Sequence, residues 1–137
     1  MNDLQLQIEK LKEKISPNFW KAIQVDEGWY QLVIDCDKEL TAIDPNYIII
    51  QVKEKFGVLR YYFEPSDAYD GEAFSKMNAI VQKYEELSAK TCEASGEPGV
   101  PMKSIGGWYK TLNPEYAASK MHYAKYSEVK EATKDTE

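Results

Sequence analysis

The residues best suited to binding chemistry gather around Arg60, the only arginine among the 17 basic residues of the chain. Lys53 and Lys55 precede Arg60, and Tyr62 follows it, in a segment that alternates like a pair of β-strands. A planar guanidinium with five donors beside an aromatic ring suits a phosphate or a carboxylate group. The sequence therefore predicts a ligand-binding or partner-binding site with these members: Gln51, Lys53, Lys55, Phe56, Arg60 and Tyr62.

Two features of this predicted site stay open. Arg60 could instead form a structural ion pair with Glu54, with Glu64 or with an acidic residue of a helix, and its charge would then serve the fold. Phe56 stands in the turn between the two strands, where its ring could be an exposed contact or could fold under the hairpin. The sequence does not decide between these alternatives.

No catalytic constellation accompanies the predicted site. No serine stands in a nucleophile elbow, and no phosphate-binding loop is present. Asp35 and Asp37 flank Cys36, but neighbours on a helix point in different directions and do not form a carboxylate pair for acid–base catalysis. His122 is the single histidine and is interpreted as a solvated side chain. We therefore predict a protein that is not an enzyme and that uses no cofactor.

The elements that must position these residues are two strands and four helices. Helices are predicted where apolar residues recur every three or four positions, and strands where β-branched and aromatic residues alternate. The helices cover residues 3–15, 29–43, 72–90 and 113–121, and the strands cover residues 47–53 and 58–64. The sequence thus predicts an α+β fold. A β-hairpin, alone or widened to a three-stranded antiparallel sheet by residues 91–117, packs on the two central helices.

The hairpin register decides which side chains face the core. Residues 54–57 are predicted to form the connection, with Gly57 suited to a positive φ. Lys53 then lies opposite Val58, and Gln51 lies opposite Arg60. The face toward the core carries only apolar or aromatic residues: Ile48, Ile50, Val52, Leu59, Tyr61 and Phe63. Arg60 and its neighbours share the outer face.

Length and composition predict one domain. The chain has 137 residues, of which 43% are hydrophobic and 29% are charged, and this is enough apolar material for a core. Within that domain, the sequence divides into an N-terminal helical segment, a helix–hairpin–helix unit, a knuckle, and a C-terminal helix with a frayed tail. These segments cover residues 1–25, 26–90, 91–117 and 118–137.

Net charge and hydropathy limit the kinds of partner and the location that the sequence predicts. The net charge of −6 disfavours duplex DNA, because phosphate binding needs a field of positive charge. No apolar run approaches the length of a membrane span, and the N-terminus lacks the pattern of a secretory signal. Cys36 and Cys92 are expected to be reduced in a cytoplasm.

Two apolar stripes carry further predictions. Leu4, Ile8, Leu11 and Ile15 form one stripe on the first helix, which could dock on its own domain or pair with a second copy in a dimer. Cys36 lies on the apolar face of the helix over residues 29–43, so we expect a buried and slowly reacting thiol.

Residues 51–62, which read QVKEKFGVLRYY, resemble the signature of a family of small uncharacterised phage and bacterial proteins. Other pieces of the chain are similar to that family in the same order: Gly28-Trp29-Tyr30, Thr91-Cys92-Glu93, Gly96, Pro98-Gly99 and residues 107–112. Each piece is weak alone, but the order and spacing match over about residues 26–117. The resemblance implies a family and no activity.

In that family, the resemblance implies a knuckle like a zinc ribbon, held by two pairs of ligands. The corresponding positions here are Cys92, Ser95, Asn113 and Tyr116, and only a cysteine is a good zinc ligand among these. We therefore expect the shape of the knuckle without its metal. A small core around Cys92 is predicted to replace the metal, with these members: Val100, Met102, Ile105, Trp108 and Tyr109.

The resemblance further implies a phage or prophage accessory protein in the cytoplasm of a host cell. Three functions remain open. The protein could bind and inhibit a host macromolecular system such as a defence complex, which an acidic surface suits. It could bind a small anionic ligand or nucleotide on the outer face of the hairpin. It could also be a nucleic-acid-binding knuckle protein, against which the lost ligands and the acidic charge both count.

Overall fold

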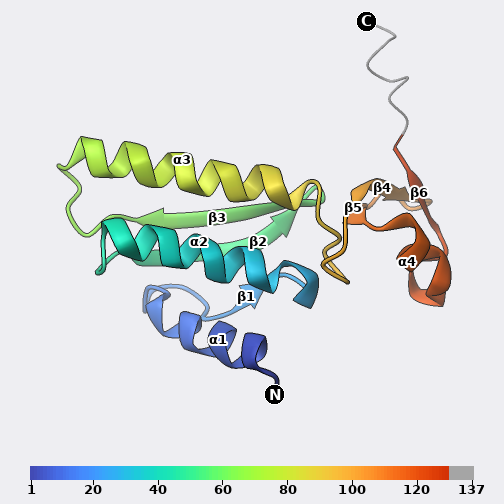
Figure 1. Ribbon diagram of the computed structural model, residues 1–137, viewed down its shortest axis with the longest axis horizontal. Coiled ribbons are helices and arrows are strands. Elements are labelled where there is room, and N and C mark those ends of the chain that lie inside the picture. Colours follow the sequence, from blue (N-terminus) through green and yellow to red (C-terminus); the bar gives the residue numbers. More distant parts are fainter. Residues whose placement is uncertain (130–137) are drawn as a thin grey trace, which may run out of the picture.

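The computed structural model describes residues 1–129 and confirms the α+β fold (Figure 1). The helices are α1 (Asp3–Leu11), η1 (Lys12–Lys14), η2 (Glu27–Trp29), α2 (Tyr30–Ile43), α3 (Gly71–Ser88), α4 (Pro114–Ser119) and η3 (Met121–Tyr123). The strands are β1 (Ile23–Gln24), β2 (Ile48–Lys55), β3 (Val58–Glu64), β4 (Val100–Ser104), β5 (Tyr109–Leu112) and β6 (Tyr126–Glu128). They form two sheets with separate cores, and we name residues 1–90 the helix lobe and residues 91–129 the knuckle lobe.

In the helix lobe, α2 and α3 cover one face of the sheet β1-β2-β3 (Figure 1). The apolar stripe of the first helix docks on this lobe, because Ile8, Leu11 and Ile15 are buried in its core. Trp29 is fully buried at the start of α2, and its Nε1 donates a hydrogen bond of 2.8 Å to the carbonyl of Thr91. The buried stripe therefore holds α1 on the helix lobe, and the buried tryptophan anchors the start of α2 to residue 91.

The third strand of this sheet comes from β1 and not from residues 91–117, so that expectation was wrong. β1 runs parallel to β2, with Ile23 opposite Val52, which makes the sheet mixed. The chain leaving α1 follows β2, and Ile15 forms a bridge with Ile49 on the way. A strand of two residues has no periodicity that a sequence could display, whereas the knuckle strands pair among themselves.

The predicted hairpin register was wrong by two residues. Lys55 lies opposite Val58 and Lys53 opposite Arg60, so that only Phe56 and Gly57 form the turn. A bulge between Ile49 and Gln51 then shifts the face of β2. Ile49 is buried and Ile48 is largely exposed, the reverse of the prediction for this end of the strand. Beyond the bulge, the predicted faces are correct.

α3 covers the free edge of β3 with polar side chains. The hydroxyl of Ser88 accepts a hydrogen bond of 2.9 Å from the backbone N–H of Leu59, and the carboxylate of Glu85 accepts one of 3.3 Å from that of Tyr61. An uncovered strand edge invites pairing with other chains, so this arrangement protects the sheet. These two hydrogen bonds also fix the backbone on both sides of Arg60, which lies between Leu59 and Tyr61.

The knuckle lobe differs from its predicted form at the C-terminal end. α4 ends at Ser119, short of Met121, because Lys120 has the extended backbone angles φ −117° and ψ 122°. Residues 126–128, predicted as a frayed tail, form β6 and pair with β4. The rest of that predicted tail, residues 130–137, lies outside the described residues. Within residues 1–129, no helix combines the length and the apolar content that crossing a membrane takes.

The core of the knuckle lobe also has other members than predicted. Met102 is buried with Cys92 in this core and Val100 packs on it, but Ile105 and Trp108 lie mostly in solvent and Tyr109 is partly exposed. Ile105 and Trp108 belong to the turn between β4 and β5, and Tyr109 is the first residue of β5. Their places are taken by Leu112 and Ala117 and by three partly buried tyrosines: Tyr116, Tyr123 and Tyr126.

Candidate binding surface

The outer face of the first sheet brings four of the predicted site residues together. Lys53 lies directly opposite Arg60, and Gln51 lies opposite Tyr62. Side chains paired across two strands have Cβ atoms about 5 Å apart. The four residues therefore form one patch in which the two cations are neighbours.

Arg60 forms an ion pair with a helix acid, one of the alternatives that the sequence left open. Its Nη1 lies 3.9 Å from Oε1 of Glu85, and about a third of the Arg60 side chain is exposed. A separation of 3.9 Å is too long for a hydrogen bond. Within the described part of the chain, the guanidinium makes no side-chain hydrogen bond by which the fold would fix it.

Phe56 lies exposed at the tip of the β2–β3 hairpin and does not fold under it. The residue is 69% exposed. Phe56 has φ 56° and Gly57 has φ 82°, the pair of positive angles that a two-residue hairpin turn requires. Asparagine or glycine usually occupies the first of these positions, and a bulky residue there is an outlier. The ammonium of Lys55 lies 5.6 Å from the Phe56 ring.

A second exposed turn, between β4 and β5, lies beside this tip. Trp108 is 74% exposed and Ile105 is 85% exposed. The ammonium of Lys103 lies 5.3 Å from the ring of Tyr109. Together the two turns enclose a hollow of about 360 Å³, which we name the tip groove: Glu54, Lys55, Phe56, Gly107, Trp108 and Tyr109.

Backbone contacts hold the two turns of the tip groove together. The hydroxyl of Thr111 donates a hydrogen bond of 2.7 Å to the carbonyl of Gly57. A Cβ on Gly57 would lie 3.2 Å from the backbone nitrogen of Lys110. Trp108 and Tyr109 were assigned to the core from the sequence. The Gly-Gly-Trp order of residues 106–108 marked a turn, which could have signalled their exposure.

A buried ion cluster, which the sequence did not reveal, joins the lobes behind the groove. Glu93 is 2% exposed, and its carboxylate accepts hydrogen bonds from the ammonium of Lys110 (2.9 Å) and from the backbone N–H of Asp26 (3.1 Å). Burial raises the pKa of Glu93, although Lys110 opposes this shift. Burial alone would lower the pKa of Lys110, but the carboxylates of Glu93 and Asp26 outweigh it and raise that pKa.

The four positions that resemble zinc ligands have other tasks in the structure. The backbone N–H of Ser95 points at Sγ of Cys92 at 3.4 Å. Asn113 caps α4 by accepting from the N–H of Tyr116, and its amide donates to the carbonyl of Pro98 at 2.9 Å. Tyr116 packs beside Cys92 in the small core. No cluster of three or more His, Cys, Asp or Glu side chains suited to a metal ion occurs within residues 1–129.

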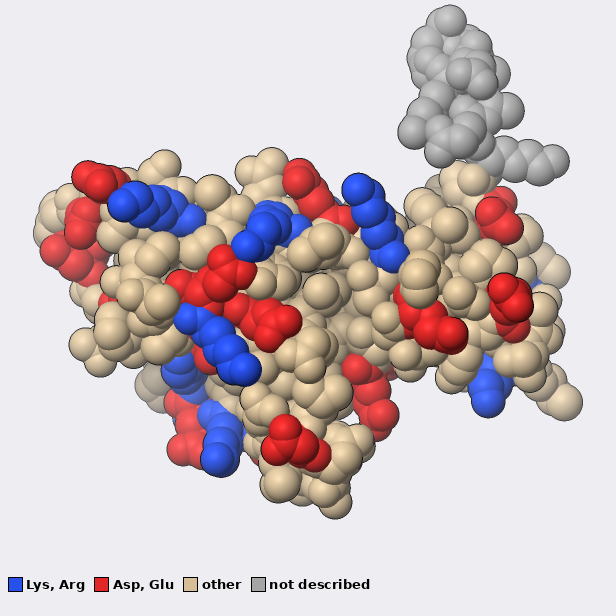
Figure 2. Space-filling view, in the orientation of Figure 1, with Lys and Arg blue, Asp and Glu red and all other residues tan. Residues whose placement is uncertain are grey.

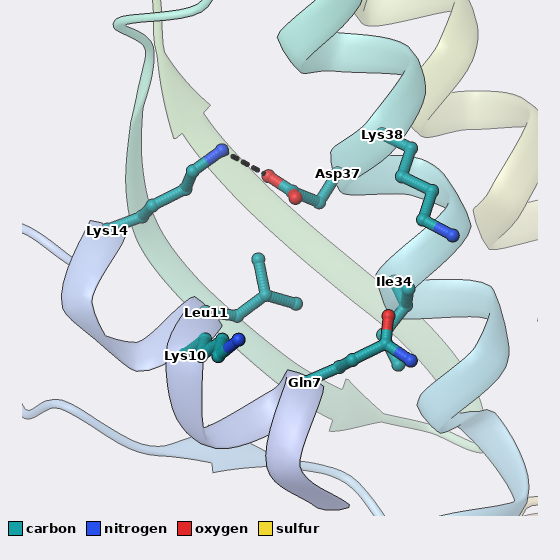
Figure 3. Close-up of a pocket in the computed structure, with 7 residues that line it drawn as sticks. All are labelled: Gln7, Lys10, Leu11, Lys14, Ile34, Asp37 and Lys38. Carbon is teal, nitrogen blue, oxygen red and sulfur yellow. Dashed lines mark hydrogen bonds and ion pairs between the residues drawn. The ribbon is translucent and has the colours of Figure 1, made fainter. Parts of the chain in front are cut away.

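A separate pocket of about 200 Å³ lies between α1 and α2 (Figure 3). Lys14 and Asp37 point toward each other across it, at 2.8 Å. The same carboxylate accepts hydrogen bonds from the hydroxyls of Tyr47 (2.6 Å) and Thr41 (3.3 Å). Asp37 of α2 therefore links η1 to the turn before β2, which is a structural role for the charged residues of this pocket.

Cys36 and Cys92 are both free and buried. Burial raises the pKa of the Cys36 thiol, and nearby Asp37 adds to the shift. The location predicted for Cys36 on the core face of α2 is confirmed. A neutral and enclosed thiol is a poor nucleophile.

Comparison of the chain with protein-family models, with curated proteins and with solved structures gave no match. The resemblance to phage and bacterial proteins stays a prediction from the motifs. The structure does bring those motifs together in space. A Cβ on Gly28 would lie 2.3 Å from the carbonyl oxygen of Cys92, and the hairpin turn meets residues 110–111.

Proposed function

We propose that this protein is not an enzyme and that it acts by binding a protein partner through the tip groove. The observation that carries the proposal is Phe56, a bulky residue that has a positive φ and is 69% exposed. Such a backbone conformation costs roughly 1–3 kcal/mol, and asparagine or glycine would lower that cost. Neither the strain nor the exposure stabilises the fold, so a contact with a partner is the better explanation.

The neighbours of Phe56 support a protein partner over a small ligand. Tryptophan and tyrosine are enriched among the residues that dominate binding energy at protein interfaces. Trp108 and Tyr109 line the groove, and Lys55 and Lys103 flank it. The rim also carries Glu54, whose carboxylate accepts a hydrogen bond of 2.6 Å from the backbone N–H of Gly57. An apolar centre with two lysines beside it fits a partner that presents an apolar side chain with acidic residues around it.

The resemblance over about residues 26–117 extends this proposal to a host. A phage or prophage accessory protein would meet its partner in a bacterial cytoplasm. By covering a functional surface of that partner, it would inhibit a host macromolecular system such as a defence complex.

Affinity capture from bacterial lysate tests the proposal, with quantitative mass spectrometry as the readout. We expect the unmodified protein to enrich a partner, and Phe56→Asn and Trp108→Ser to lose it without a lower melting temperature. Tyr69→Ser is the matched control, because Tyr69 is almost fully exposed in the loop before α3, at the other end of the hairpin (Figure 1). A partner that both groove variants retain would contradict the proposal.

The outer face of the sheet supports a second candidate function, the binding of a small anionic ligand or nucleotide. Arg60 and Lys53 are direct cross-strand neighbours, and the ion pair of Arg60 is long at 3.9 Å. Small molecules released from the captured protein would be compared by mass spectrometry. We expect Arg60→Ala to lose a phosphate or carboxylate compound that Phe56→Asn retains. An equal yield from both variants would exclude this face.

Duplex DNA remains an improbable partner under this proposal. Basic and acidic side chains are interspersed on the face shown in Figure 2, without a continuous basic field. With a net charge of −6, the protein offers few phosphate contacts. We expect no gel shift of duplex DNA at submicromolar protein in 0.15 M salt, and a persistent shift would overturn this expectation.

A further inference from the structure

A polar cleft of about 460 Å³ opens where the two lobes meet, apart from the tip groove. We name it the junction cleft. It is lined by residues that lie far apart in the sequence, the principal ones being Asp26, Glu27, Tyr30, Tyr116, His122 and Tyr123. Its volume suits a small organic molecule.

Carboxylates give the junction cleft a negative character. Asp26 and Glu27 are exposed at its edge, and the buried carboxylate of Glu93 lies behind Asp26. Two ammonium groups oppose them. Lys110 shares its charge between Glu93 (2.9 Å) and Asp26 (3.3 Å), and the Lys120 ammonium lies over the Tyr116 ring. Among residues 1–129, Glu27 accepts only a neutral amide hydrogen bond, from Gln5 at 2.8 Å. The carboxylate of Glu27 is therefore available to an additional cation.

Aromatic rings complete the cleft. The rings of Tyr116 and Tyr123 lie 6.4 Å apart, and that of His122 packs edge-on against Tyr123 at 4.7 Å. Tyr30 contributes a third tyrosine from the start of α2. The pKa of Tyr30 is raised, by burial and then by Glu27, which keeps this phenol neutral. Faces of aromatic rings attract cations, and several rings together form the cages that bind alkylammonium groups.

The chain itself shows that one of these rings accepts an ammonium group. The Nζ of Lys120 lies 5.3 Å from the centre of the Tyr116 ring. Lys12, a cation near Tyr30 within residues 1–129, is paired with Glu9 at 2.5 Å.

We infer that the junction cleft binds a small alkylammonium compound between its tyrosine rings and the carboxylates of Asp26 and Glu27. The rings would contact the methylene and ammonium groups, and the carboxylates would accept charge-assisted hydrogen bonds. A hydrophobic ligand without charge would gain little, because polar groups dominate the walls. This inference is independent of the tip groove and of the partner proposed for it.

Titration with hexamethylenediamine tests the inference, and hexanediol of the same chain length is the uncharged control. Binding would be followed by amide chemical shifts in NMR and by calorimetry. We expect saturable shifts at Tyr30 and Tyr123 with the diamine, none with the diol, and no shift of the Trp108 indole in the tip groove. Equal responses to diamine and diol, shifts located elsewhere, or no binding at millimolar diamine would each overturn it.

Two variants separate a site from a general effect of negative charge. Glu27→Gln changes an exposed side chain, and Tyr123→Leu removes a ring, so we expect each to weaken diamine binding about tenfold. Glu13→Gln removes one exposed carboxylate away from the cleft and is the matched control for charge. If Glu27→Gln binds the diamine as tightly as Glu13→Gln does, the cleft is not the site. This comparison decides the question even if Tyr123→Leu fails to fold.

Discussion

The helix lobe and the knuckle lobe differ in how much apolar side chain each one buries. The core of the helix lobe contains 18 buried residues and that of the knuckle lobe contains four. Units of about 40 residues or fewer rarely fold on a hydrophobic core alone and usually need a metal, disulfides or a partner. The described knuckle lobe has 39 residues, 91–129, and we expect it to depend on the helix lobe.

The junction between the lobes supplies what the small core lacks. Trp29 donates to the carbonyl of Thr91, and Thr111 donates to that of Gly57. Asp26 of the helix lobe pairs with Lys110, and its backbone N–H donates to Glu93. The comparison teaches that a lobe with little apolar surface can be ordered by a few buried polar contacts with a larger neighbour.

The largest expected effect comes from Lys110→Met, which leaves the carboxylate of Glu93 buried without its cation. We expect the free energy of unfolding to fall by roughly 3–5 kcal/mol. Chemical denaturation would measure this loss. Lys83→Met is the matched control in the helix lobe, where Lys83 pairs with Glu39 at the surface, and we expect it to cost about 0–1 kcal/mol.

The pH dependence of Lys110→Met sharpens this prediction. A carboxyl whose pKa is raised on folding holds its proton more firmly in the folded state, so stability falls as the pH rises. The variant should therefore lose less stability at pH 5 than at pH 7.5, relative to the unmodified protein. Lys110→Met combined with Glu93→Gln should recover part of the loss. A loss independent of pH would show that the charge of Glu93 is not the cause.

Gly28→Ala is expected to have the next largest effect, because it forces the lobes apart. The new Cβ would lie 2.3 Å from the carbonyl oxygen of Cys92 and 2.4 Å from that of Glu93. Such overpacking costs roughly 1–3 kcal/mol, and thermal unfolding would measure it. Gly71→Ala is the matched control, since a Cβ there meets no atom within 4 Å. Equal melting temperatures of the two variants would contradict the close approach.

Thiol labelling compares the lobes directly, because each contains one fully buried cysteine. We expect both to react slowly in the native protein, and Cys92 to react faster than Cys36. The reason is that local opening needs less free energy in the lobe with the smaller core. Mass spectrometry of each labelled peptide would give the two rates. Equal labelling rates would indicate that the lobes open together.

We also expect Cys36→Ser to lower the free energy of unfolding by about 1–3 kcal/mol through a buried hydroxyl.

Arg60→Ala is expected to have the smallest effect on stability, about 0–1 kcal/mol. Arg60 is partly exposed and its ion pair with Glu85 is long, so truncation leaves the core intact. Thermal unfolding and ligand binding should be measured on the same variant. A loss of several kcal/mol would show that Arg60 is structural, and unchanged binding would remove it from the anionic-ligand site.

The sequence by itself determined the helices and the composition of the larger core. Apolar spacing located α2 and α3, the core position of Cys36 and the apolar stripe of the first helix, since each of these follows from a periodicity within one element. That the stripe docks on its own lobe was decided by the tertiary structure. The sequence also placed Gln51, Lys53, Arg60 and Tyr62 on the outer face, because alternation along a strand is local.

Only the tertiary structure decided the turn type, the third strand and the tip groove. A two-residue turn with Phe56 at positive φ contradicts the usual preference for that position, so local propensity predicted a longer connection. Residues 23–24 form the strand β1 only because they pair with β2. Trp108 and Phe56 line one hollow, and Lys110 pairs with Asp26, because two lobes meet at residues far apart in the chain. Such contacts depend on packing between elements, which the pattern within one element does not contain.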